Sequence, residues 1–114
     1  MTPEQTGLIH RIRALLADEP TVREVSMFGG ISFMVNEKMI VAAGKDGSLL
    51  VRVDAERHEE LLDRQGAAQA VMGTGRDMGP GWIRVTVDAI SEDEPLASWI
   101  DVAMDYNRTV TASD

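Results

Sequence analysis

Residues 26–35, SMFGGISFMV, contain two adjacent glycines, Gly29 and Gly30, of the kind that lets a backbone approach a phosphate closely. A phosphate-binding loop has a strand before its glycines and a helix after them, so that the helix N-terminus meets the anion. Here the β-prone run ISFMV follows, and no Lys-Ser or Lys-Thr pair comes directly after the glycines. The pattern therefore favours a turn or a bulge over a phosphate cradle.

A second glycine cluster, GTGRDMGPG at residues 73–81, surrounds the charged pair Arg76 and Asp77. The β-prone run WIRVTVD follows it, so it lacks the helix that a dinucleotide-binding fingerprint places after its glycines. Two interpretations remain open. The cluster is either a long surface connection, or a loop in which Arg76, with Trp82 close by, contacts a small anionic ligand or substrate.

The remaining polar residues do not form a catalytic or metal-binding pattern. His10 and His58 are single histidines in predicted helices with no second histidine at ligand spacing, which is typical of surface side chains. Acidic pairs four residues apart, such as Asp101 and Asp105, are typical of the solvated side of an amphipathic helix. No serine lies in a GxSxG context. The sequence therefore predicts no enzyme, no catalytic residue, no cofactor and no metal site.

Composition and charge narrow the function classes further. The chain has 114 residues, 44% of them apolar, which suits a single domain over residues 1–114. Nineteen acidic against eleven basic side chains give a net charge of −8, and the basic residues are scattered singly, so we expect no direct nucleic-acid binding. The sequence has no cysteine and shows no leader pattern, so we expect the chain to be cytoplasmic. It also has no apolar run near the roughly 20 residues that span a membrane, so we expect no membrane contact.

The elements that must position these residues follow from sequence periodicity. Thr2 as an N-cap and Pro3 at the first helical position predict a helix that ends before Pro20. Between residues 22 and 53, four β-prone runs are separated by breaks, at 36–38 and 44–47 among them, that are short enough for hairpins and so predict an antiparallel meander. The apolar stripe of the first helix is predicted to consist of Leu8, Ile9, Ile12, Leu15 and Leu16.

The second half of the chain is expected to add three elements. Asp54 caps a helix that stops at Gly66, a strand covers residues 82–88, and a last helix opens in the acidic stretch 91–95. Over the whole chain, the expected order of helix, four strands, helix, strand and helix predicts an α+β fold in two layers, with an antiparallel sheet and helices on one face. The last helix is expected to bury Leu96, Trp99, Ile100, Ala103 and Met104.

The pattern as a whole resembles the N-terminal domain of the TfoX (Sxy) competence-regulator family over roughly residues 3–108. The two hairpin breaks, Met78 and the strand at Trp82 support the resemblance in the expected order. The family motif maps onto Met27, Phe28, Gly29, Gly30, Gly75 and Arg76. The resemblance implies a secretion-chaperone-like α+β domain without an established enzymatic activity. It also implies that the motif residues are scaffold, with Arg76 tying down the glycine loop.

The full-length regulators of this family carry a second, helical domain and act as coactivators of competence genes beside a cAMP-responsive transcription factor. The resemblance covers only the first of these domains, so the competence role itself is left open. From the resemblance we expect a non-enzymatic protein–protein interaction module in transcriptional regulation, with the transcription machinery as partner and with a homodimer formed through an exposed sheet edge or face. The alternative is a small-anion binder or enzyme that uses the glycine-rich loop around Arg76.

Overall fold

Helix α1 (Pro3–Leu15) begins where the sequence predicts, because the Thr2 hydroxyl oxygen accepts a hydrogen bond from the Gln5 backbone amide at 3.1 Å. The computed structural model describes residues 2–27, 30–72 and 76–111. The predicted burial of Leu15 is wrong: this side chain is 42% exposed, because it is the last helical residue and lies at the edge of the apolar stripe. The other four members of the stripe are buried: Leu8, Ile9, Ile12 and Leu16.

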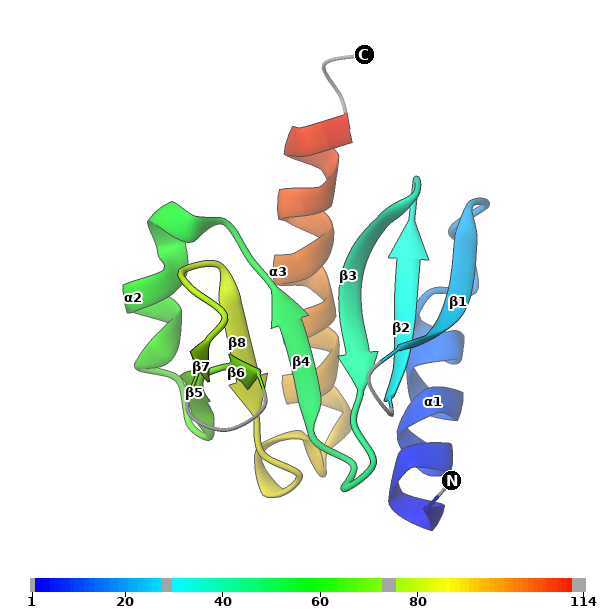
Figure 1. The fold of residues 1–114 in the computed structure, drawn as a ribbon. Helices are drawn as coiled ribbons and strands as arrows, with labels where there is room; N and C mark the ends of the chain where they lie inside the picture. The colour runs from blue at the N-terminus through cyan, green and yellow to red at the C-terminus, as the bar shows by residue number, and fades with distance from the viewer. Residues whose placement is uncertain (1, 28–29, 73–75, 112–114) are drawn as a thin grey trace.

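Six strands form one antiparallel sheet in the order β1-β2-β3-β4-β8-β5 (Figure 1). The first four make the predicted meander, in which each strand pairs antiparallel with the next one along the chain. The next strand in the sheet, β8 (Trp82–Val85), pairs with the last strand of the meander and is shorter than predicted. The meander strands are β1 (Val22–Met27), β2 (Gly30–Val35), β3 (Lys38–Ala43) and β4 (Leu49–Arg52).

The segment between Gly66 and β8 departs from the prediction of a connection without strands. Strand β5 (Ala67–Gln69) pairs with β8 and forms the far edge of the sheet, while β6 (Val71–Met72) and β7 (Arg76–Asp77) pair with each other as a separate ribbon. The predicted second helix is also shorter than expected. It consists of a 3-10 turn, η1 (Ala55–Arg57), and α2 (His58–Leu62).

The helices lie on one face of the sheet, as the sequence predicts (Figure 1). Helix α3 (Asp93–Thr111) follows a 3-10 turn, η2 (Asp88–Ile90), and packs against β3 and β4, while α1 packs against β3 and α3. Helix α2 joins the same layer, because Arg64 after its end donates to the Ser98 hydroxyl at 3.0 Å and lies 5.0 Å above the Trp99 ring of α3. The five predicted α3 core residues are all buried.

A β-bulge in β3 decides which side chains reach the open face of the sheet. Phe33 pairs with Val41, but Met34 pairs with Met39, so β3 has one extra residue, Ile40, at this point. Ile40 and Val41 are both fully buried against the helices. Met39 consequently shares the opposite face with Met34, although simple alternation would place it on the same side as Val41.

The hairpin between β2 and β3 is held against the C-terminal half of α3. Asn36 and Glu37 both have positive φ, 53° and 66°, which is the backbone of a two-residue turn that matches the twist of the strands. The Asn36 amide group donates to the Asn107 side-chain oxygen at 3.5 Å, and Asn107 donates to the Val35 carbonyl oxygen at 2.9 Å. The Asn36 backbone amide also donates to the Thr21 hydroxyl oxygen at 3.1 Å.

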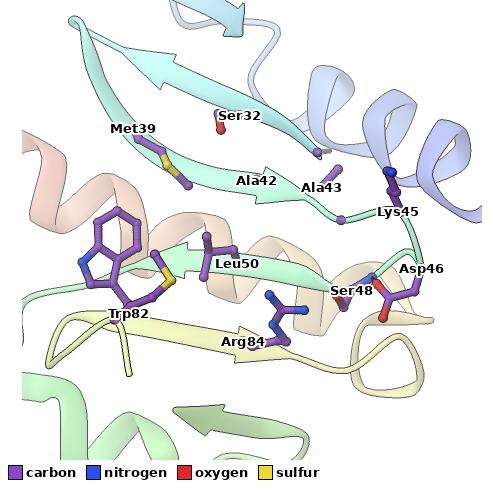
Figure 2. Close-up of a pocket in the computed structure, with 13 residues that line it drawn as sticks. Ser32, Met39, Ala42, Ala43, Lys45, Asp46, Ser48, Leu50, Trp82 and Arg84 are labelled. Carbon is purple, nitrogen blue, oxygen red and sulfur yellow. Dashed lines mark hydrogen bonds between the residues drawn. The ribbon is translucent and has the colours of Figure 1, made fainter. Parts of the chain in front are cut away.

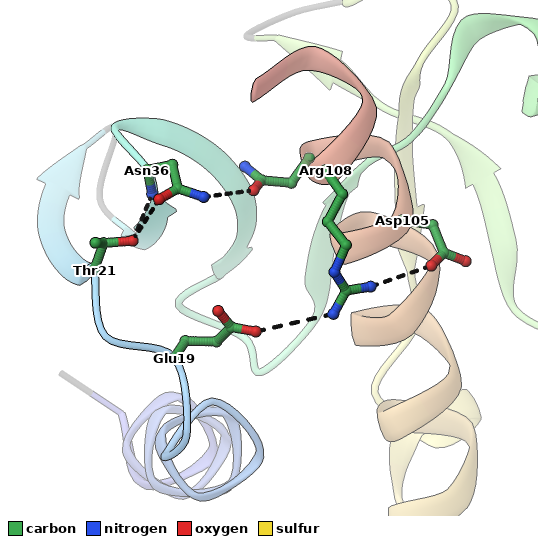
Figure 3. A network of polar contacts seen from close by, with 6 residues as sticks. Glu19, Thr21, Asn36, Asp105 and Arg108 are labelled. Carbon is green, nitrogen blue, oxygen red and sulfur yellow. Dashed lines mark hydrogen bonds and ion pairs between the residues drawn. The ribbon is translucent and has the colours of Figure 1, made fainter. Parts of the chain in front are cut away.

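Figure 3 shows the ion pairs beside this hairpin. Arg108 of α3 lies 3.3 Å from Asp105 on the same helix and 3.9 Å from Glu19, which follows α1. These groups are largely solvated, so their contribution to stability is small, about 0–1 kcal/mol for each pair. Arg108 of the helix layer is therefore engaged with carboxylates of the same layer.

Candidate functional site

The first glycine motif lies at the end of a hairpin. Met27 ends β1 and pairs with Gly30, which begins β2, so a strand and not a helix follows the glycines. This arrangement confirms that the motif is not a helix-terminated phosphate loop. Phe28 and Gly29 lie outside the described residues, so their predicted structural role stays a prediction.

In the second motif, Arg76 does not line the hollow described below, whereas Met78 does. The Arg76 side chain is exposed on β7 and makes no hydrogen bond or ion pair with the other described residues. Gly75 lies outside the described part of the chain, so the prediction that Arg76 ties down the glycine loop stays a prediction. Trp82, the second candidate ligand contact, begins β8 and is half-buried on the open face of the sheet.

The open face of the sheet has a floor of small side chains. Ser32, Ala42 and Leu50 are successive cross-strand neighbours on β2, β3 and β4, and Arg84 of β8 lies opposite Leu50. Cross-strand neighbours place their side chains on the same face. Serine and alanine in the middle of this row are short, so the sheet surface is hollow there.

The hollow above this floor has a volume of about 490 Å³ and is amphipathic (Figure 2). Trp82 and Met39 lie toward one end, together with Met78, which follows β7. Lys45 of the β3–β4 turn lies toward the other end, and Arg84 lies between the two ends, opposite Leu50. A volume in this range suits a small ligand or the side chains of a partner segment.

A second, smaller hollow of about 260 Å³ adjoins the first and shares Met39 and Trp82 with it. Arg52 lies between its aromatic walls, 4.6 Å from the centre of the Trp82 ring and 5.3 Å from that of Tyr106. A guanidinium over two rings is held by cation–π attraction, which fixes its position. We call the two joined hollows the open-face groove.

The charges that line the open-face groove are opposite in sign to the chain as a whole. Four cations line it, and Asp46 is the one carboxylate among its described lining residues. The ion pairs among the described residues use other basic side chains, Arg11, Arg13, Arg23, Arg57 and Arg108. The groove cations, which are not ion-paired to any described carboxylate, are Lys38, Lys45, Arg52 and Arg84.

Asp46 is already engaged by its own turn. Its Oδ1 accepts a hydrogen bond from the Ser48 hydroxyl at 2.6 Å and from the Ser48 backbone amide at 3.0 Å. These two donors lower the pKa of the Asp46 carboxyl below its ordinary value, and Arg84 nearby adds a smaller contribution in the same direction. The carboxylate therefore stays charged at neutral pH and shapes the β3–β4 turn.

Replacing Ser48 by alanine is expected to raise the pKa of Asp46 toward its ordinary value of about 3.9, because the main hydrogen-bond donor is lost. In the native protein the folded-state pKa is lower than the unfolded-state pKa. Asp46 therefore contributes stability that is fully present above the unfolded-state pKa and is lost as the pH falls through the folded-state pKa. An NMR titration of the Asp46 side-chain carboxyl measures the shift. Ser32→Ala, at the other serine of the hollow, is the control, and an equal shift in both variants would contradict the assignment.

His58 corrects the prediction of two surface histidines. His10 is exposed, but His58 is 6% exposed and is a structural residue. Its Nδ1 accepts a hydrogen bond from the Gly81 amide at 2.9 Å, which leaves Nε2 to donate to the Gln69 side-chain oxygen at 2.8 Å. The Gln69 amide in turn donates to the Gly79 carbonyl oxygen at 3.0 Å. This chain of bonds connects α2 to β5 and to the turn before β8.

Other site types find no support in the part of the chain that the structure describes. No group of three histidine, aspartate or glutamate side chains there comes together as ligands for a metal ion. No helix there combines the length and the hydropathy needed to cross a bilayer.

Comparison with known families agrees with this fold. The sequence model described as the TfoX N-terminal domain matches residues 14–106, most of the chain. The chain belongs to the TfoX N-terminal domain family. This family is not known for an enzymatic activity. A search of curated proteins finds no match.

A solved structure confirms the architecture of this TfoX N-terminal domain. The crystal structure of a protein from Pseudomonas syringae aligns with a TM-score of 0.57 at 15% identity, over 90% of this chain and 96% of that one. At this identity the similarity concerns the fold alone. It indicates that this fold is not peculiar to one sequence.

Sequence reasoning identified Trp82 but missed the rest of the open-face groove. Lys45 and Arg84 are far apart in the chain, and only the pairing of β4 with β8 brings them to one hollow. One feature of the sequence did point to this face of the sheet. Leu50 and Arg52 alternate with Leu49, Val51 and Val53, which marks a strand with one mixed face.

Proposed function

We propose that this TfoX N-terminal domain is a non-enzymatic interaction module that acts through protein contacts in transcriptional regulation. The observation that carries the proposal is the open face of the sheet. Its amphipathic groove is lined by Met39, Leu50 and Trp82 and is not covered by any described element of the chain. Exposed surfaces that combine aromatic, methionine and arginine side chains are typical of protein interfaces.

Family membership gives the direction of the proposal, since the TfoX N-terminal domain takes its name from a regulator. The sheet also has two edges, β1 and β5, and an edge strand or the open face is the surface through which two copies of this chain would form a homodimer. We expect the transcription machinery to be the partner, in the cytoplasm, without direct contact to nucleic acid.

Affinity capture with matched variants tests the proposal. Tagged wild-type protein, Leu50→Glu and Leu15→Glu are incubated with lysate of the source organism, with and without nuclease, and bound proteins are quantified by mass spectrometry. Leu50 lies on the groove floor, whereas Leu15 is an exposed leucine of α1, so both variants carry the same change at different places. Circular dichroism verifies that both variants fold.

The expected result is a polymerase subunit or transcription factor that resists nuclease and binds both the wild type and Leu15→Glu. Its recovery should fall at least about fivefold with Leu50→Glu, because the variant loses an apolar contact on the groove floor, desolvates a carboxylate there and neutralises Arg84, which lies opposite. Loss of every partner after nuclease treatment would contradict the proposal, because nucleic acid would then bridge them. Equal recovery with Leu50→Glu would show that the open face is not the contact surface.

A further inference from the structure

We propose that the open-face groove binds an acidic amphipathic helix of about three turns from a partner protein. This inference rests on the proposed function, since it names the chemistry of the partner for the same face. It follows from three properties of the groove: its charge, its length and the state of the backbone in its floor.

The charge of the groove calls for an acidic partner. The chain has a net charge of −8, yet four cations and only one described carboxylate line the groove. Five of the seven basic residues elsewhere, Arg11, Arg13, Arg23, Arg57 and Arg108, are ion-paired to carboxylates of the same chain, whereas none of the four groove cations is ion-paired to a described carboxylate. Asp46, which is held by Ser48 and interacts with Arg84, supplies one negative charge against these four positive charges. A partner with carboxylates would supply the missing counter-charges.

The positions of these charges set the length of the partner. Lys45 lies at one end of the groove, Lys38 and Arg52 line the hollow at the other end, and Arg84 lies between them, opposite Leu50. Strand β3 lines the groove from Lys38 to its last residue, a span of about 15–20 Å at the usual rise of a strand. A helix of the same length has about 10–13 residues, which is three turns.

The middle of the groove selects an apolar stripe on that helix. Met39, Met78 and Trp82 form its wall, and Ala42 and Leu50 form its floor. Methionines adapt their shape to a partner side chain, and Trp82 offers a large amphipathic surface. The expected helix therefore carries apolar residues on one stripe in its centre and carboxylates at both ends.

The backbone of the floor explains why we assign a helix and not an extended peptide. The floor residues Ser32, Ala42, Leu50 and Arg84 each have a cross-strand partner on both sides. An extended peptide lying on this face would find no free backbone groups to pair with, whereas a helix satisfies its own. The opposite face is already covered by helices, so a helix here would add a third layer to the fold.

The probe is a fluorescein-labelled synthetic peptide of roughly 14 residues, with leucines three and four residues apart on one stripe and two glutamates at each end. The control peptide has the same composition in scrambled order. Fluorescence anisotropy is measured with the wild type, with Arg84→Glu and with Arg11→Glu. Arg11 pairs with Asp93 in the helix layer, so Arg11→Glu changes the net charge equally at a place away from the groove.

The two tryptophans serve as an internal control in the same experiment. Trp82 lines the groove, whereas Trp99 is 3% exposed in the core beneath the helices. We expect the helical peptide to shift the Trp82 indole N–H signal in an NMR spectrum and to leave that of Trp99 in place. We also expect Arg84→Glu to weaken binding at least about tenfold and Arg11→Glu less than about twofold.

Several results would overturn the inference. These are no binding of the helical peptide up to about 500 μM, equal binding of the scrambled peptide, and a shift of Trp99 as large as that of Trp82. A Trp82 signal that moves with protein concentration alone would assign the groove to a second copy of the chain. Tighter binding of a short single-stranded DNA than of the acidic peptide would assign it to nucleic acid.

The peptide experiment and the affinity capture fail independently. A transcription protein that is lost with Leu50→Glu, together with no peptide binding, would leave the proposed function intact and refute the helix. Specific peptide binding at Trp82, without any captured transcription protein, would support the helix-binding groove and refute the regulatory role.

Discussion

Replacing Gly66 by alanine is expected to lower the free energy of unfolding by about 3 kcal/mol. This figure is the sum of two costs, that of placing an alanine in a left-handed backbone conformation and that of an overpacked contact. Gly66 has a φ of +78°, where side chains are disfavoured, and a Cβ added there would lie 2.3 Å from the Ala89 Cβ and 2.7 Å from the Thr86 hydroxyl oxygen. The Gly66 carbonyl oxygen also accepts a hydrogen bond from the Thr86 amide at 3.1 Å. The new methyl group would therefore push apart the end of α2 and the segment after β8.

Gly79→Ala is the matched control for this substitution. Gly79 has a similar φ of +92°, but an added Cβ would meet no other atom within 4 Å. Only the conformational cost remains, about 1 kcal/mol. Urea unfolding of both variants measures the difference, and equal losses would show that the close contact with Ala89 is relieved at little cost.

Replacing His58 by leucine is expected to lower the free energy of unfolding by about 2–3 kcal/mol, because two buried polar groups lose their partners. The Gly81 amide would lose its acceptor at 2.9 Å, and the Gln69 side-chain oxygen would lose its donor at 2.8 Å. Leucine fills a similar volume, so the loss reports on hydrogen bonding more than on a cavity.

The second histidine provides the control for this prediction. His10 is exposed on α1, so His10→Leu should change the free energy of unfolding by less than about 0.5 kcal/mol. Hydrogen exchange gives a local measurement in addition to urea unfolding, since the Gly81 amide should exchange much faster in His58→Leu. An unchanged exchange rate at Gly81 would contradict the proposed role of His58.

The elements that could be predicted from the sequence are those whose pattern is local. The Thr2 cap, the turn residues around Asn36 and the alternation near Leu50 lie within a few positions of the elements they define. Strand β5 and the ribbon of β6 and β7 could not be predicted in this way. They are only two or three residues long, too short for a periodic pattern, and pairing with β8 or with each other makes them strands.

The candidate site was largely invisible in the sequence for the same reason. His58 becomes a buried residue through Gly81, which is 23 positions away in the chain. The bulge at Ile40 turns Met39 to the open face. This bulge is a shift in the pairing register of β2 and β3, which cannot be read from the composition of either strand. The scattered basic residues gave no sign of a cluster, because Arg52 and Arg84 come near Lys38 of β3 and Lys45 of the β3–β4 turn only after the strands have paired.

The one-sided charge lining the groove has a consequence for the kinetics of association. A molecule with a net charge of −8 and a cationic open face has a large electric dipole whose positive pole points out of the sheet. At about 0.01 M salt the Debye length is roughly 30 Å, close to the 36 × 28 × 26 Å dimensions of the protein, so an acidic partner is repelled by the whole charge. At about 0.1 M salt it falls to roughly 10 Å, and the partner then senses mainly the pole it faces. Encounter with an acidic partner is therefore fastest at an intermediate ionic strength, where the dipole still orients the approach and the net repulsion is screened.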